Sequence, residues 1–172
     1  AAIKRKYPKA HITWVTKAPA HALVQNLVDV DRVLTLHPED LLKLSAVEFD
    51  IAFIIDKSLA ATGVLKQTKA REVYGFQNNP YSGAIVPANP EARELWELGL
   101  DDARKFFGNR KTEQQLVHES LALGFYMRDE YAVTLTAQEQ ELAAVRRELW
   151  GHPGIPTIGI NTGCSPTLPH KK

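Results

Sequence analysis

The stretch "FDIAFIIDKSLAATG" (residues 49–63) decides the fold, because an apolar run at 51–55 ends abruptly in Asp56, Lys57 and Ser58. Parallel strands that are covered on both faces read as continuous apolar runs, so residues 50–56 predict a buried strand. Ser58 can cap a helix that we expect to continue to about residue 69. A core has no use for an acid and a lysine at the tip of such a strand, and these residues need another explanation.

The same alternation of strand and helix precedes and follows this stretch. Short β-branched segments predict three further strands, and segments with helical spacing and a proline near the start predict two further helices. Four alternations with short connections predict an α/β fold, a Rossmann-like doubly wound parallel sheet. A set of separate amphipathic helices is the alternative. The strands are expected at 11–15, 32–36 and 71–76, and the helices at 19–27 and 37–44.

The second half of the chain has a different pattern. Residues 78–90 are rich in turn formers and predict a loop, and short helices are expected at 91–99, 101–108 and 111–125. His118 falls on a polar face of the last of these and is expected at the surface. Thr136 and Glu139 form a capping box at the start of a helix over 136–151.

A Pro/Gly-rich joint after this helix predicts a domain boundary near Gly151. Residues 1–150 would form one domain, and residues 151–172 would begin a second with a strand at 155–161. The first residues are typical of the last turn of a helix, and the last residues stop in a loop. We therefore expect a fragment of a longer enzyme.

Composition excludes several classes of protein. The 172 residues are 44% apolar and 24% charged, enough to fold around a core, and the net charge of +1 gives no general attraction to nucleic acid. The single cysteine, Cys164, cannot form an internal disulfide. No apolar run approaches the roughly 20 residues of a membrane span. The histidines have no metal-ligand spacing. We expect a cytoplasmic protein with no metal site and no nucleic-acid partner.

Two segments could carry chemistry. Ligands of open parallel sheets bind beyond the carboxyl ends of the strands, where Asp56, Lys57 and Ser58 are expected. Lys57 would pair with a phosphate or a sugar acid, and Asp56 would orient it or accept hydrogen bonds from sugar hydroxyls. Alternatively, Asp56 and Ser58 only cap the next helix while Lys57 is solvated. The residues alone leave both interpretations open.

The second segment is "GINTGCSPTLPHKK" (residues 159–172), a strand followed by glycine, hydroxyl and lysine side chains. Ser165 and Thr167 offer donors and Lys171 offers charge, which suits a diphosphate, although the spacing is not that of a P-loop. The basic turn at residues 4–6 is usually a solvated face, but it could touch an anionic membrane surface.

The ordered segments 7–34, 49–76 and 158–172 resemble the heptosyltransferases of glycosyltransferase family nine, which build the inner core of lipopolysaccharide. The resemblance rests on Tyr-Pro-x-Ala before the first strand, on Asp50 followed by Lys57-Ser58 at the strand end, and on the order of the segments. It implies one half of a two-domain GT-B-type enzyme. This chain would be most of the acceptor-binding domain, without its first strand, and the start of the nucleotide-sugar-binding domain.

The resemblance also implies site residues. Asp56, Lys57, Ser58 and Arg71 would line the acceptor side of the cleft, with Lys57 facing the Kdo carboxylates or phosphates and Arg71 nearby. The residues expected on the donor side are Ser165, Thr167 and Lys171. The family's catalytic base, an aspartate after the first strand, would lie upstream of residue 1, so this chain alone should be inactive.

The implied reaction is an inverting, metal-independent transfer of heptose from ADP-heptose to Kdo-lipid A or a heptosylated acceptor. ADP-heptose would be the donor substrate, with no further cofactor, and the enzyme would contact the inner membrane peripherally. Two alternatives remain. One is a nucleotide-sugar epimerase with a similar two-domain architecture. The other is a receiver-like signalling module with Asp56 as the phosphoacceptor, for which the required acidic pair and later lysine are not found.

Overall fold

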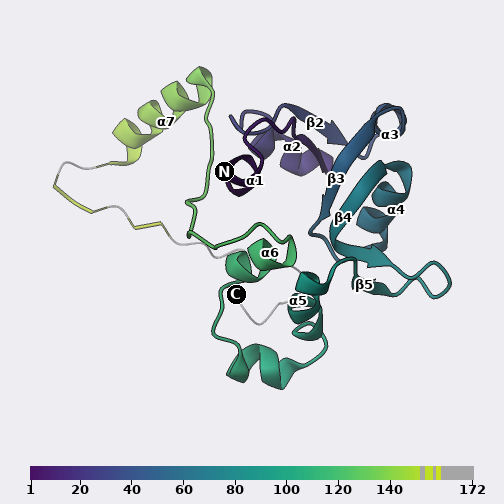
Figure 1. Cartoon of the computed structure of the whole chain (residues 1–172). Coiled ribbons are helices and arrows are strands. Elements are labelled where there is room, and N and C mark those ends of the chain that lie inside the picture. The colour runs from purple at the N-terminus through teal and green to yellow at the C-terminus, as the bar shows by residue number, and fades with distance from the viewer. Residues whose placement is uncertain (152–153, 157, 160–172) are drawn as a thin grey trace. The chain divides into compact units, whose positions relative to one another are not determined.

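The computed structural model describes residues 1–151, 154–156, 158 and 159 (Figure 1). The chain divides into two compact units, Ala1–Thr134 and Leu135–Lys172, which are described separately. The division lies before the last helix, so that helix belongs to the second unit, and the domain boundary near Gly151 stays a prediction. The strand expected at 155–161 lies largely outside the described residues.

Strands and helices alternate through the first half of unit 1, as the sequence predicts. The order is α1 (Ala2–Lys6), β1 (Thr13–Thr16), α2 (Ala18–Val24), β2 (Arg32–Thr35), α3 (Pro38–Ser45), β3 (Glu48–Ile54), α4 (Leu59–Gln67) and β4 (Lys69–Asn78). Strand β1 pairs in parallel with β2, and β3 pairs in parallel with β4. The α/β class and its parallel pairing are therefore confirmed.

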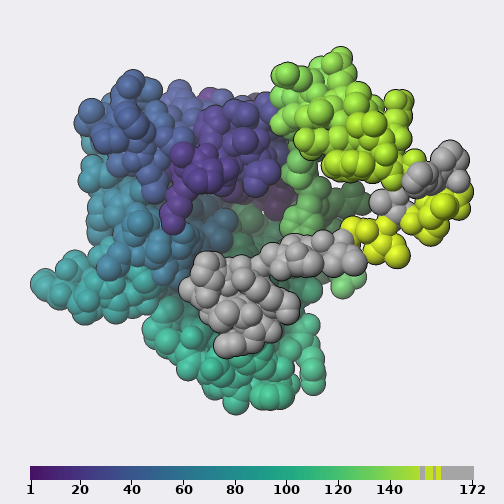
Figure 2. Space-filling view, turned by 180° about the vertical axis from the view of Figure 1, so that it is seen from behind, coloured from purple at the N-terminus to yellow at the C-terminus, as the bar shows by residue number. Residues whose placement is uncertain are grey.

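The expected single sheet is not continuous in the described residues. Strands β1 and β2 form one sheet, and β3, β4 and β5 (Ile85–Pro87) form another. Residues 85–87 were expected in a loop, and that prediction is wrong: β5 returns antiparallel to the end of β4. The side chain of Asn79 accepts hydrogen bonds from the backbone N–H groups of Tyr81 and Ser82 and so shapes the turn. The β4–β5 hairpin projects from the rest of unit 1 (Figure 2).

The second half of unit 1 is built from short helices. They are η1 (Pro90–Ala92), α5 (Arg93–Glu97), η2 (Arg104–Gly108) and α6 (Glu113–Ser120). Helix α6 ends five residues before the expected residue 125, because Ala122 and Gly124 adopt left-handed conformations with φ of 51° and 90°. His118 was expected at the surface, which is wrong. It is buried, its Nε2 lies 3.2 Å from the Gly124 carbonyl oxygen, and the Tyr126 ring packs edge-on against it.

The core gathers where α4, η1 and α6 meet β4. Phe76 of β4 is fully buried there. The apolar run of β3 is only half-buried, so the prediction of a strand covered on both faces is not met within unit 1. Most of the buried apolar side chains lie around β4. Among the described residues they are Leu34, Leu44, Leu65, Phe76, Ala92, Leu98, Leu116 and Leu121.

Gly75 and Asn89 hold this junction together. Gly75 lies opposite Ile54 in the β3–β4 register and has a φ of +96°, and a Cβ atom there would overlap the carbonyl oxygen of Ile54. Its N–H donates to the side-chain oxygen of buried Asn89 at 2.6 Å. The amide nitrogen of Asn89 donates to the Ser120 carbonyl oxygen at 3.0 Å and to Glu91 at 2.8 Å. One amide thus joins β4, η1 and the end of α6.

Gly75→Ala is therefore expected to destabilise the protein by about 3 kcal/mol or more, through left-handed strain and the overlap with the Ile54 carbonyl. Urea unfolding followed by circular dichroism measures this. Gly63→Ala is the matched control: nothing lies within 4 Å of its added methyl group, and alanine favours helix α4 by up to about 1 kcal/mol. Equal stabilities of the two variants would contradict the account.

Asp40 fixes the start of α3 to the end of β2. Its carboxylate accepts hydrogen bonds from the backbone N–H of Thr35 at 2.9 Å, from the Thr35 hydroxyl at 2.8 Å and from the Lys43 ammonium at 3.2 Å. The first of these contributes most, and together they lower the pKa of Asp40 to about 2. Folding therefore favours the ionised carboxylate.

The stabilisation from Asp40 should be complete above its ordinary pKa of 3.8 and should be lost as the pH falls towards about 2. Asp40→Asn is expected to be less stable than the parent chain at neutral pH, and the difference should shrink through this window. Denaturation curves at a series of pH values measure it. Glu39→Gln is the control, because its exposed carboxylate also pairs with Lys43 but accepts no backbone hydrogen bond from another element among the described residues. A difference that stays constant with pH would refute the assignment.

Unit 2 contains α7 (Ala137–Trp150), which starts with the predicted capping box. The Thr136 hydroxyl accepts from the N–H of Glu139 at 3.2 Å, and the Glu139 carboxylate accepts from the N–H of Thr136 at 2.8 Å. Leu142, Val145 and Leu149 recur at helical spacing and form an apolar stripe along α7, which is exposed within this unit. Across the described parts of both units, no helix combines the length and apolar character that crossing a bilayer requires.

Candidate functional site

Asp56, Lys57 and Ser58 follow the carboxyl end of β3, next to the first turn of α4. Ser58 has extended backbone angles, and its hydroxyl oxygen accepts a hydrogen bond from the N–H of Ala61 at 3.2 Å. This is the N-cap that the sequence predicts. The hydroxyl of Ser58 is therefore committed to the helix.

Lys57 turns away from α4 and reaches the end of α5. Its Nζ donates to the carbonyl oxygen of Leu95 at 2.9 Å and lies 4.9 Å from the centre of the Phe76 ring. The N–H of Gly99 bonds to Trp96 instead, so Leu95 carries one of the unpaired carbonyl groups at the helix end. A cation there also interacts favourably with the helix dipole.

This contact alters the chemistry of Lys57. Partial burial, followed by the positive charge of Lys105, lowers the pKa of Lys57, while Glu113 opposes the change. The side chain remains partly exposed. Lys57 is thus neither the freely solvated lysine of one interpretation nor a lysine reserved for a ligand.

Asp56 is the uncommitted member of the three. Its side chain is exposed and has neither an ion pair nor a hydrogen bond to any residue that the structure describes. A carboxylate in this state can accept hydrogen bonds from the hydroxyl groups of a sugar. The strand end therefore offers one free acceptor beside one partly engaged cation.

Arg71 does not join this group, and its expected proximity to Lys57 is wrong. It lies near the start of β4 and pairs with Asp50 at 3.2 Å. Asp50 precedes Asp56 by six residues of extended chain, or roughly 20 Å. Because β3 and β4 run parallel, Arg71 lies at the opposite end of the strand pair.

The residues expected on the donor side, Ser165, Thr167 and Lys171, lie outside the described residues, and their roles stay predictions. Within the described part of the chain, no three His, Cys, Asp or Glu side chains come together as metal ligands would.

The basic turn in α1 is occupied by contacts within unit 1. Lys4 pairs with Asp31 at 3.0 Å, and Arg5 makes two hydrogen bonds to the Asp129 carboxylate, at 2.7 and 2.9 Å. Lys6 donates to the Ala122 carbonyl oxygen at 2.6 Å. Arg5 and Lys6 thus hold the segment after α6 against the amino end, and all three contacts leave less charge for a membrane surface.

Lys57→Met is expected to destabilise the protein by about 1 kcal/mol, because the Leu95 carbonyl loses its charged partner at a partly exposed position. Chemical denaturation measures the change. Lys9→Met is the matched control, since Lys9 is exposed in a loop and has no partner among the described residues. Equal stability of the two variants would show that the contact with α5 contributes nothing.

Comparison with known proteins adds no assignment to this geometry. No family model, no curated protein and no solved structure matches the chain.

Proposed function

We propose that this chain is the acceptor-binding half of a GT-B-type glycosyltransferase that transfers heptose from ADP-heptose to the inner core of lipopolysaccharide. The proposal combines the motif resemblance with one structural observation. That observation is the arrangement of four strands as two parallel pairs, with Asp56, Lys57 and Ser58 at the carboxyl end of β3.

The two pairs fit the outer parts of a doubly wound sheet. In the order 3-2-1-4-5, the second and third strands pair on one side of the first strand, and the fourth and fifth pair on the other. Strands β1 and β2 would be the first of these pairs, and β3 and β4 would be the second. One further parallel strand, lying in the sheet between β1 and β3, would join the two pairs into a single Rossmann-like sheet. It would also cover the half-buried apolar run of β3.

This order also supports the position of the site. The direction of winding reverses between the first and fourth strands, and ligands of such sheets bind in the crevice at that point. Strand β3 would be the fourth strand, so the segment from Asp56 to Ser58 would line the crevice. The free carboxylate of Asp56 would accept hydrogen bonds from hydroxyl groups of the acceptor sugar. Lys57 would approach a carboxylate or phosphate of the same substrate.

The chemistry requires few protein groups. An inverting transfer needs a base that takes the proton of the acceptor hydroxyl and positive groups that offset charge on the departing ADP. The base would come directly after the additional strand that joins the two pairs. Ser165, Thr167 and Lys171 would act on the diphosphate. The role of Asp56 would be to position the acceptor rather than to take the proton.

The test is a mass-spectrometric assay of the complete protein that contains these residues, with ADP-heptose and Kdo-lipid A. We expect the acceptor to gain the mass of one heptose. Asp56→Asn should lower kcat/KM at least tenfold, mainly through KM, because acceptor positioning is lost.

Asp50→Asn is the control, since Asp50 is also an exposed aspartate but lies towards the opposite end of β3, where it pairs with Arg71. It should retain the parent rate. A folded protein that transfers no sugar from ADP-heptose or related donors would refute the transferase and favour the epimerase. Normal transfer by Asp56→Asn would support the proposed transferase activity but refute the proposed role of Asp56 in binding the acceptor.

A further inference from the structure

An open pocket of about 370 Å³ lies where β5, η1 and α5 meet. Pocket volumes of this size hold a small ligand. Two prolines and an indole supply apolar wall, while an amide, a guanidinium and a carboxylate supply polar groups. These lining residues are Pro87, Asn89, Pro90, Arg93, Trp96 and Glu97.

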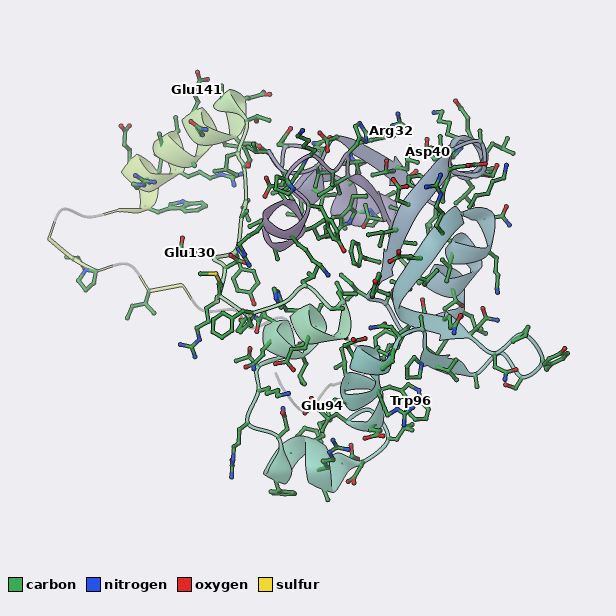
Figure 3. All side chains as sticks on the ribbon, in the orientation of Figure 1. Arg32, Asp40, Glu94, Trp96, Glu130 and Glu141 are labelled. Atoms are coloured by element: carbon green, nitrogen blue, oxygen red, sulfur yellow. The ribbon has the colours of Figure 1, made fainter. Side chains whose placement is uncertain are left out.

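Most polar groups of the pocket are held in place by bonds within unit 1. The indole N–H of Trp96 donates to the Ile85 carbonyl oxygen at 2.7 Å, which points the ring towards β5 (Figure 3). Arg104 binds the carboxylate of Glu97 at 2.6 Å. Asn89 is fixed by the junction with Gly75 described above. These walls are therefore preorganised.

Arg93 is the exception. Its side chain is exposed at the pocket and has no ion pair or hydrogen bond to any residue in the described ranges. A guanidinium offers five N–H donors in a planar fork that matches a carboxylate or phosphate. The pocket therefore combines fixed walls with one free cationic group.

The mixture of walls narrows the ligand class. A purely apolar ligand would displace water from the Arg93 guanidinium without offering hydrogen bonds in its place. A bare anion would leave the apolar walls unused and would face the carboxylate of Glu97. A sugar ring has an apolar C–H face, hydroxyl donors at its edge and, in acidic or phosphorylated sugars, an oxyanion.

We propose that this pocket binds a monosaccharide ring that carries a carboxylate or a phosphate. Arg93 binds the oxyanion, the indole of Trp96 packs against the ring, and the Glu97 carboxylate accepts a hydroxyl hydrogen bond. Lys57 meets α5 at the Leu95 carbonyl, whereas the pocket uses other residues of that helix. The inference does not depend on the proposed transferase.

The experiment is an NMR titration of the whole chain, followed at the three tryptophan indole N–H signals. Trp96→Phe assigns the signal of Trp96. The probes are glucuronate for the carboxylate, glucose 6-phosphate for the phosphate, glucose as the neutral ring and inorganic phosphate as the bare anion. We expect millimolar glucuronate or glucose 6-phosphate to shift the Trp96 signal, with Trp14 and Trp150 unchanged.

Arg93→Gln should weaken this binding about tenfold and should fold normally, because Arg93 has no partner among the described residues. Arg110→Gln is the matched control, an exposed arginine outside the pocket, and should bind as the parent does. A response to only one anionic sugar supports the proposal and identifies the oxyanion. The proposal is overturned if the Trp96 signal does not move, if glucose or inorganic phosphate binds as well, or if Arg93→Gln has no effect.

Discussion

The amide of Asn89 is the interaction on which unit 1 depends. It reaches the backbone of Gly75 on one side and the backbone of Ser120 on the other, in a place where water cannot replace either bond. A buried polar group that loses its partner is costly, so the strand, the short helices and α6 must keep this arrangement together. The left-handed Gly75 is part of the same constraint, because a residue with a Cβ could not bring β4 this close to Ile54. This polar junction thus fixes how the strand, the short helices and α6 meet, while burial of the apolar side chains around it supplies most of the driving force for folding.

Local structure could be predicted from the sequence where a residue acts on its own neighbours. Ser58 and Thr136 cap their helices through side-chain bonds to the N–H three residues on, so "S-L-A-A" and "T-A-Q-E" were sufficient signals. The strands before and after α4 were likewise clear from their apolar and β-branched runs. The parallel pairing followed from the short connections between alternating elements.

Long-range partners were not predictable in the same way. Nothing in "IIDKS" indicates that Lys57 will meet a carbonyl thirty-eight residues later in the chain. The motif resemblance placed Arg71 near Lys57 at the carboxyl end of β3. The parallel register of β3 and β4 instead places Arg71 beside Asp50, near the start of both strands. His118 looked polar in a helical projection, yet the left-handed turn after α6 folds Gly124 and Tyr126 over it. The Asn-Pro-Glu segment before α5 was a cap signal that could have drawn attention to Asn89.

The bond between Lys57 and Leu95 has a mechanical consequence. An ammonium group has three N–H donors, and the Leu95 carbonyl uses one of them. The other two belong to a side chain that the bond already restrains. Lys57 would therefore lose less side-chain entropy when an anion binds at the end of β3. Any displacement of Lys57 by that anion would also pull on α5, a helix of only five residues that carries Arg93 and Trp96. An anion bound at the strand end would thus act on the pocket beside β5 through a single lysine.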